Sequence, residues 1–282
     1  MKPTQRIAGF DLYIEGEGAQ TLVMLHGWPD TWRLWDAQMP ALLPHYRCVR
    51  LTLPGFGAGE PACAVPLAAL IDGLRQVVEA VSPGRPVILM LHDWGCLFGY
   101  QFVMEHPALV SRLIGVDIGD ATSRRFIKFL SAKQKAMIFA YQAWLALAWT
   151  VGGDAGGGLG TRMTRWMARQ LRCPTEPQQI HAGMNYPYFI TWTGAHGSYR
   201  GLRPFEPPCP MLFIYGRRKP VPFHSPDWAE RVATRPGSRV VKMEAGHWMM
   251  VQQPDAFNAA MLDWLGTPVA AGSSPTNISP AI

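Results

Sequence analysis

Hydrophobic positions along the chain fall into short unbroken runs, separated by stretches in which apolar residues recur at helical spacing. The clearest run is 87–91, which breaks into a tight turn before helix-like sequence at 97–104. Short aliphatic runs between turn residues are typical of buried strands. The further strands predicted in this way are 21–27, 46–53, 110–117, 210–216 and 238–243, and residues 67–81 have the spacing of a helix. Alternating strands and helices predict a mostly parallel sheet flanked by helices on both faces.

The regular alternation stops between residues 121 and 203, a region rich in Trp, Met and Tyr. We expect a helical lid inserted after the strand that ends at Asp117, with the glycine-rich run 152–158 as a loop or hinge inside it. That run lacks the strand and the lysine of a phosphate-binding loop, so no nucleotide site is expected. The predicted organisation is core 1–120, lid 121–203, core 204–266 and a flexible tail at 267–282.

Composition narrows the class of protein. The chain has 282 residues, of which 48% are hydrophobic and 16% charged, enough to bury a large core. Its five cysteines include no CxxC pair, which indicates a reducing compartment and no metal site. The net charge of +6 comes from scattered Lys and Arg, so no nucleic-acid partner is expected. No apolar signal region follows the N-terminus, and the apolar stretch 137–151 is short for a membrane span. We expect a cytoplasmic protein without a membrane partner.

The turn after the 87–91 run carries the most specific chemistry. A strand, a sharp turn and a helix form the scaffold that presents a nucleophile at the apex of the turn. The residue at this apex is Asp93, where a serine is more usual. A carboxylate nucleophile attacks a saturated carbon that carries a leaving group, and the alkyl ester that results must then be hydrolysed.

Two other turns are predicted to meet Asp93. The first is His26-Gly27-Trp28-Pro29, where the backbone N–H of Trp28, with that of Trp94, would form an oxyanion hole. Taken alone, this motif is equally compatible with an ordinary turn that buries tryptophans. The second is a late Gly-His turn, in which His247 is the candidate base that activates water.

The acid that orients His247 has two usual places. The segment after the predicted strand 210–216 contains no nearby carboxylate. Asp117 ends the strand that follows the elbow helix, where a buried carboxylate can accept the His Nδ1–H, so Asp117 is favoured. Asp120 is the neighbouring alternative, and its structural interpretation is a cap on the first lid helix. The remaining candidates are Asp227 and Glu244.

As a set, these motifs resemble the Asp-nucleophile branch of the α/β-hydrolase superfamily, which includes epoxide hydrolases, haloalkane dehalogenases and fluoroacetate-type dehalogenases. The resemblance covers residues 12–265 and implies an α/β-hydrolase fold with an inserted helical lid. The His-Asp-Trp-Gly elbow and the His-Gly-Trp-Pro loop look like those of epoxide hydrolases. The stretch 99–117 is more similar to fluoroacetate-type dehalogenases, including the position of Asp117.

In epoxide hydrolases two lid tyrosines bind the epoxide oxygen. The Phe-Ala-Tyr-Gln stretch around Tyr141 and the Ser-Tyr-Arg stretch around Tyr199 match their contexts, so the resemblance implies these two residues. The segment after Tyr199 is shortened, and Tyr186 and Tyr188 stay open as alternatives for the second tyrosine. Trp94 would donate to a halide in a dehalogenase, so it does not discriminate between the two activities. The expected substrate-binding residues are Tyr141, Tyr199, Trp94 and Trp28.

The resemblance implies conversion of an epoxide to a vicinal diol through a covalent ester on Asp93, without a metal or organic cofactor. The many aromatic residues of the lid suggest a small hydrophobic epoxide as substrate. Dehalogenation of a haloalkane or haloacid by the same nucleophile is the alternative. Ester hydrolysis is disfavoured because the chain has no Gly-x-Ser-x-Gly, and a non-catalytic receptor is disfavoured because no triad member is clearly lost. The natural substrate and the oligomeric state, monomer or homodimer, stay open.

Overall fold

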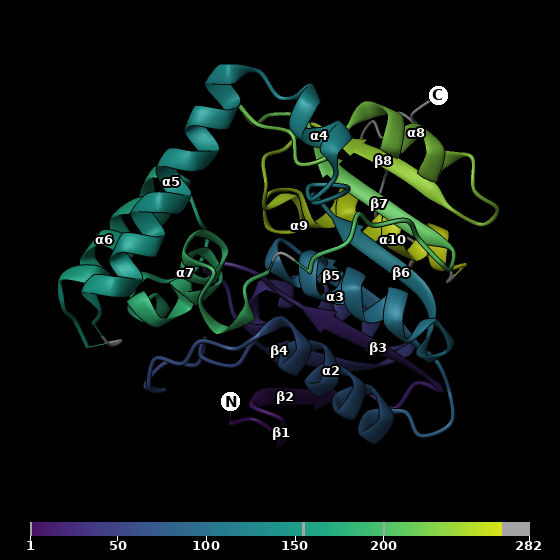
Figure 1. Ribbon diagram of the computed structural model, residues 1–282. Coiled ribbons are helices and arrows are strands. Elements are labelled where there is room, and N and C mark those ends of the chain that lie inside the picture. The colour runs from purple at the N-terminus through teal and green to yellow at the C-terminus, as the bar shows by residue number, and fades with distance from the viewer. Residues whose placement is uncertain (1, 154–155, 200, 267–282) are drawn as a thin grey trace.

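A computed structural model describes residues 2–153, 156–199 and 201–266 (Figure 1). The predicted tail at 267–282 and part of the glycine-rich run, residues 154 and 155, lie outside the described residues. Among the described residues, no helix combines the length and the apolar character needed to cross a membrane.

One eight-stranded sheet organises the molecule, with the strand order β1-β2-β4-β3-β5-β6-β7-β8. β2 pairs antiparallel with both of its neighbours. The other six strands, β4, β3, β5, β6, β7 and β8 in their order across the sheet, run parallel to one another. The predicted mostly parallel sheet is therefore confirmed. The strands are β1 (Gln5–Ile7), β2 (Phe10–Glu15), β3 (Gln20–Leu25), β4 (Tyr46–Thr52), β5 (Val87–His92), β6 (Val110–Val116), β7 (Met211–Gly216) and β8 (Arg239–Met243).

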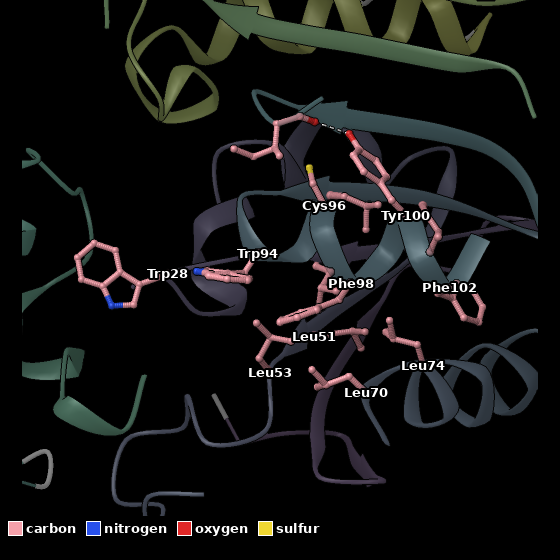
Figure 2. Packing of buried hydrophobic residues seen from close by; sticks show 14 of the residues in the cluster. Trp28, Leu51, Leu53, Leu70, Leu74, Trp94, Cys96, Phe98, Tyr100 and Phe102 are labelled. Atoms are coloured by element: carbon pink, nitrogen blue, oxygen red, sulfur yellow. Dashed lines mark hydrogen bonds between the residues drawn. The ribbon is translucent and has the colours of Figure 1, made fainter. Parts of the chain in front are cut away.

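Helices cover both faces of this sheet because successive strand residues point to opposite sides. In β5, Leu89 packs with the helices α2, α3 and α8, whereas Met90 packs on the other face with α1, α9 and α10. Figure 2 shows the first of these two layers, in which α3 contributes Phe98 and α2 contributes Leu70. These helices are α1 (Met39–Leu42), α2 (Leu67–Val81), α3 (Trp94–Glu105), α8 (Pro226–Ala233), α9 (Met249–Gln252) and α10 (Pro254–Leu265).

Between β6 and β7 the chain forms a separate group of helices, which lies beside the sheet in Figure 1. A capping box formed by Ser131 and Gln134 starts the longest of them, and this reciprocal bonding satisfies N–H groups that a helix start leaves open. The group is placed next to the carboxyl ends of the parallel strands, where sites form in open α/β sheets. Its helices are α4 (Arg124–Phe129), α5 (Ala132–Val151), α6 (Leu159–Gln170) and α7 (Tyr186–Thr193).

Candidate active site

The turn that carries Asp93 is a sharp elbow between β5 and α3. Asp93 has φ 52° and ψ −122°, a conformation that costs a non-glycine residue about 1–3 kcal/mol and persists only where the surroundings enforce it. Two glycines make room for the elbow. A Cβ on Gly27 would lie 2.3 Å from the Asp93 Oδ1, and a Cβ on Gly95 would lie 2.5 Å from the His26 carbonyl oxygen. The local sequence thus presents a carboxylate at the end of a buried strand.

Each oxygen of Asp93 has its own partner. The backbone N–H of Trp28 donates to Oδ1 at 2.7 Å, and Nε2 of His247 lies 3.4 Å from Oδ2. Trp94 begins α3, and a helix leaves its first N–H groups without intrahelical acceptors. Burial opposes ionisation of Asp93, but the hydrogen bond and positive charge of His247 outweigh it and lower the pKa of this carboxyl.

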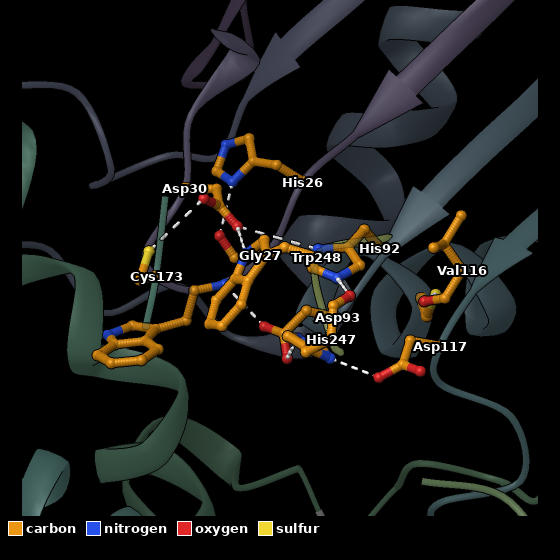
Figure 3. Close-up of polar contacts among 12 residues, drawn as sticks. His26, Gly27, Asp30, His92, Asp93, Val116, Asp117, Cys173, His247 and Trp248 are labelled. Atoms are coloured by element: carbon orange, nitrogen blue, oxygen red, sulfur yellow. Dashed lines mark hydrogen bonds and ion pairs between the residues drawn. The ribbon is translucent and has the colours of Figure 1, made fainter. Parts of the chain in front are cut away.

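His247 lies between two carboxylates, because its Nδ1 donates to Oδ2 of Asp117 at 2.5 Å (Figure 3). Asp117 follows β6, is fully buried and has φ 70°. Burial of the ring opposes its protonation, but the hydrogen bonds to Asp117 and Asp93 outweigh this and raise the pKa of His247 to about 9. The structure therefore brings together Asp93, His247 and Asp117, three residues predicted from separate motifs.

The ammonium group of Lys219 contacts Oδ1 of Asp117, which also accepts the Gly216 backbone N–H at 3.1 Å. Burial alone would raise the pKa of Asp117, but Lys219 and His247 hold it well below its usual range. No role was predicted for Lys219, because the Lys and Arg residues of the chain were interpreted as scattered charges. The available signal was its position after β7, one of the two usual places of the acid.

The other candidate acids lie in different surroundings. Asp120 accepts hydrogen bonds from the backbone and hydroxyl of Ser225 and from the hydroxyl of Ser123. Ser123, not Asp120, caps α4, so the alternative interpretation of Asp120 as the cap is wrong: a further turn, closed by the Ser123 N–H on the Asp120 carbonyl, precedes the helix. Glu244 pairs at the surface with arginines 217 and 218, and Asp227 lies in the first turn of α8.

A buried polar network lies behind His247, and no role was predicted for it. Asp30 is fully buried and accepts hydrogen bonds from the Trp248 indole at 2.9 Å and from the Thr175 hydroxyl at 2.5 Å. Burial raises the pKa of Asp30 to about 6 although both donors oppose this. His92 donates from Nε2 to the His247 carbonyl at 3.1 Å, and the two rings lie 4.4 Å apart. The network thereby fixes the backbone and the ring position of His247.

A mostly apolar cavity of about 510 Å³ opens between the sheet and the lid, with Asp93 and Trp94 among its lining residues. The remaining lining residues are Leu97, Ile118, Ala121, Thr122, Phe126, Ile127, Leu130, Lys135, Ile138, Phe139, Tyr141, Gln142, Tyr188, Thr191, Trp192, Ser198, Tyr199, Leu202 and Phe223. In the described part of the chain, no group of three or more His, Cys, Asp or Glu is arranged to hold a metal ion.

Three of the four candidate tyrosines line this cavity, and their hydroxyls have different surroundings. Tyr141 and Tyr188 both line it with ring centroids 6.0 Å apart, and burial, together with the nearby charge of Asp93, raises the pKa of each. Tyr199 also lines the cavity, but its hydroxyl donates to the Val65 carbonyl at 3.1 Å. Tyr186 is not among the lining residues and packs against Phe56 and Trp149. The two tyrosines that line the cavity without a hydrogen bond to the Val65 carbonyl, and so best match the expected pair, are Tyr141 and Tyr188.

The fold and this arrangement agree with a comparison against known families. The model of the alpha/beta hydrolase family matches residues 22–260, which is most of the chain. The chain belongs to the alpha/beta hydrolase family, as its elbow and sheet order indicate.

Curated relatives match parts of the chain. A soluble epoxide hydrolase of a Corynebacterium species is 29% identical over 107 residues, which cover 38% of this chain and 37% of that protein. Epoxide hydrolase 1 of Caenorhabditis elegans is 26% identical over 127 residues, or 43% and 31% of the two chains. A probable oxidoreductase EphD of Mycobacterium tuberculosis is 34% identical over 101 residues, or 34% of this chain and 17% of its own. The matched segments thus span well under half of each relative.

Solved structures show the same fold over nearly the whole chain. An epoxide hydrolase of Bacillus megaterium, determined with an inhibitor, has a TM-score of 0.70 and 21% identity, covering 93% of this chain and 99% of that one. A thermophilic esterase of Thermogutta terrifontis has a TM-score of 0.60 and 18% identity, covering 91% and 93%. At these identities the likeness concerns the fold, and the choice of reaction depends on the residues of the site.

Proposed function

We propose that the protein is an epoxide hydrolase that forms a covalent alkyl ester on Asp93. The observation that carries the proposal is one cavity lined by the Asp93 carboxylate, with His247 at 3.4 Å from it, and by Tyr141, Tyr188 and Tyr199, the last with its hydroxyl bound to the Val65 carbonyl. A serine hydrolase requires a hydroxyl nucleophile at the elbow, which Asp93 does not provide. Ring opening of an epoxide requires a nucleophile and an acid that protonates the departing oxygen.

In the first step Oδ2 of Asp93 attacks a ring carbon, and the carbon–oxygen bond of the epoxide breaks. The hydroxyls of Tyr141 and Tyr188 bind the epoxide oxygen, and one of them supplies its proton. The resulting tyrosinate regains a proton from the imidazolium of His247, which leaves a neutral base. This transfer becomes favourable because esterification removes the Asp93 charge that helped to raise the pKa of His247.

In the second step His247 takes a proton from water, whose oxygen adds to the carbonyl carbon of the Asp93 ester. The oxyanion that forms is placed where Oδ1 now accepts the Trp28 N–H, and Trp94 offers the second backbone donor. Collapse breaks the bond between the carbon and the alkyl oxygen, and the imidazolium returns a proton to the leaving alkoxide. Asp117 stabilises the imidazolium throughout and keeps the ring in the required tautomer.

Isotope labelling tests the covalent route. In a single turnover in ¹⁸O-water the diol should carry an unlabelled oxygen from Asp93, and the peptide that contains Asp93 should gain the label. Label in the diol with none in the protein would overturn the proposal. The Asp93→Asn variant is the control and should neither turn over nor acquire label.

Dehalogenation by the same nucleophile is the second candidate, favoured by the position of Asp117 after β6. The two tyrosines argue against it, because a halide leaves as an anion and needs donors but no proton. Styrene-type epoxides and chlorinated, brominated and fluorinated substrates should be compared on one preparation. Diol formation without halide release is expected, and the reverse result would favour the dehalogenase.

A further inference from the structure

Charge is unevenly divided between the two parts of the chain. Residues 121–203 contain eleven Lys and Arg against two Asp and Glu, a net charge of +9. The rest of the chain contains fifteen against eighteen, a net charge of −3, which together make the +6 of the whole chain. No acidic residue occurs between 121 and 153, the stretch that contains α4 and α5. The net positive charge is therefore not scattered along the whole chain, as expected from the sequence, but comes from residues 121–203.

Exposed apolar side chains follow the same division. Among the described residues eleven large hydrophobic side chains are exposed, and ten of them lie between 121 and 203. Three of the ten, Ile127, Phe139 and Trp192, line the mouth of the cavity and are 51%, 54% and 46% exposed. Phe139 and Trp192 meet edge to face with their centroids 5.0 Å apart. Apolar residues gathered at an opening in this way usually mark an interaction surface.

The cations lie among these apolar side chains. We define the mouth surface as the exposed side chains of 124–139 together with Trp192. Lys135 lines the cavity next to Phe139, and Lys128, Phe129 and Lys133 are exposed outside it. Within the part of the chain that the structure describes, none of the five cations of 124–135 forms an ion pair with a carboxylate. These charges are therefore available to an anionic partner.

We propose that the mouth surface docks on an anionic lipid bilayer, with the cavity opening against it. Aromatic and aliphatic side chains interspersed with Lys and Arg are what an interfacial contact requires, since the former enter the acyl boundary while the latter attract anionic headgroups. A second copy meeting through the same surface would place the five cations against five others, which electrostatics opposes. The sequence predicted no membrane partner, because it contains neither a predicted membrane span nor a signal region. A peripheral contact with a bilayer requires neither of them.

Docking would give an apolar substrate a direct path from the bilayer into the cavity. This consequence rests on the proposed function, whereas docking itself does not. Binding is therefore to be measured without turnover, on the parent chain and on Asp93→Asn, which should bind vesicles equally. If vesicles bind but no epoxide is converted, the proposed function fails and the docking surface stands.

The test is sedimentation of the full chain with phosphatidylcholine vesicles and with mixed phosphatidylcholine–phosphatidylglycerol vesicles. The parent protein should sediment with the mixed vesicles, dissociate from them at high salt and not bind the neutral phosphatidylcholine vesicles. Reversing two cations outside the cavity, Lys128→Glu with Lys133→Glu, should weaken binding at least about 30-fold, since each cation near the surface is worth roughly a factor of five. Phe129→Ser should also weaken binding without any change of charge.

A charge-matched control separates this surface from net charge. Lys2→Glu with Arg85→Glu changes the total charge equally at exposed positions outside the lid, Arg85 lying before β5. This control should bind like the parent. Equal loss in both double variants, equal binding to neutral vesicles, or no binding to either vesicle would overturn the proposal. So would a dimer in solution that the Lys128→Glu, Lys133→Glu pair dissociates, because a second copy would then cover the surface.

Discussion

Replacing Asp117 by asparagine tests the arrangement of the proposed site most sharply. The change removes the charge that lies 2.5 Å from His247 Nδ1, and it leaves the Lys219 ammonium without its carboxylate. Loss of the charge removes the stabilisation of the imidazolium and weakens control of the tautomer. An equivalent change in a serine protease triad lowers turnover by about 10⁴-fold, and we expect a loss of that order in ester hydrolysis here. Alkylation of Asp93 should persist, because a tyrosine supplies the proton for ring opening and the imidazolium serves only to reprotonate that tyrosine afterwards.

The same substitution should also destabilise the fold. Asp117 is fully buried and the Lys219 side chain is 9% exposed, so the pair is a buried one. Removing one partner of a buried pair costs about 3–5 kcal/mol in the free energy of unfolding. The double variant Asp117→Asn, Lys219→Met also removes the orphaned charge and should recover most of that stability. It should not recover hydrolysis, which separates the stabilising role of the ion pair from the orienting role of Asp117.

Two measurements check this reasoning. The intact mass of Asp117→Asn after mixing with substrate should rise by the mass of the epoxide and stay raised, whereas the parent should return to its starting mass. Urea unfolding gives the free energies for the single and double variants. Asp120→Asn is the matched control: it should lose about 2 kcal/mol or more with its buried hydrogen bonds but keep its turnover when folded. Normal hydrolysis in Asp117→Asn, or hydrolysis abolished only in Asp120→Asn, would refute the assignment.

Three further predictions concern other parts of the site. Tyr188→Phe should slow alkylation of the enzyme at least about 100-fold, measured by stopped-flow tryptophan fluorescence, because one acid for the epoxide oxygen is lost. Tyr199→Phe should keep the alkylation rate and lose about 1 kcal/mol of stability with its hydrogen bond to the Val65 carbonyl. The opposite ranking would restore Tyr199 as the second tyrosine. Gly27→Ala should abolish alkylation in a rapid-quench assay, because the new Cβ would lie 2.3 Å from the Asp93 Oδ1 and displace this carboxylate, while circular dichroism shows an unchanged fold. Undiminished alkylation would show that the new Cβ does not displace it. The folded protein raises the pKa of His247 from 6.5 to about 9, so the stability that this group contributes is complete below about pH 6.5 and is lost as the pH rises through 9. The free energy of unfolding of the parent should therefore fall across this window. A fall of equal size in His247→Gln would show that another group causes it.

Local pattern predicted much of the fold but not all of it. The parallel strands β3 to β8 were predicted because buried strands are continuous apolar runs, whose signal is contained in each segment. The two antiparallel strands β1 and β2 were missed. β1 has only three residues, and β2 alternates polar with apolar positions such as Asp11 and Leu12. β1 pairs with β2, and β2 in turn pairs with β4, which lies more than 30 residues further along the chain.

For the site, residues within one turn of chain were predictable, and contacts between elements were not. The elbow around Asp93 and the Gly-His turn of His247 have signatures that span a few residues. The choice between tyrosines was different, because the sequence context of Tyr199 matched the expected one while its hydroxyl is bound to Val65, 134 positions away. Which hydroxyl faces the nucleophile depends on how the lid packs.

The sequence by itself determined the order of the parallel strands and helices, the insertion before β7 and the residue at the apex of the elbow, Asp93, since each of these is encoded by residues adjacent in the chain. Only the tertiary structure decided that Lys219 supports Asp117 across 102 positions, that Tyr188 joins Tyr141 at the cavity, and that Asp30 closes a network behind His247. The physical reason is that an ion pair, a ring contact or a buried hydrogen bond depends on distance in space. Distances between elements are set by the packing of helices on the sheet, to which every element contributes at once.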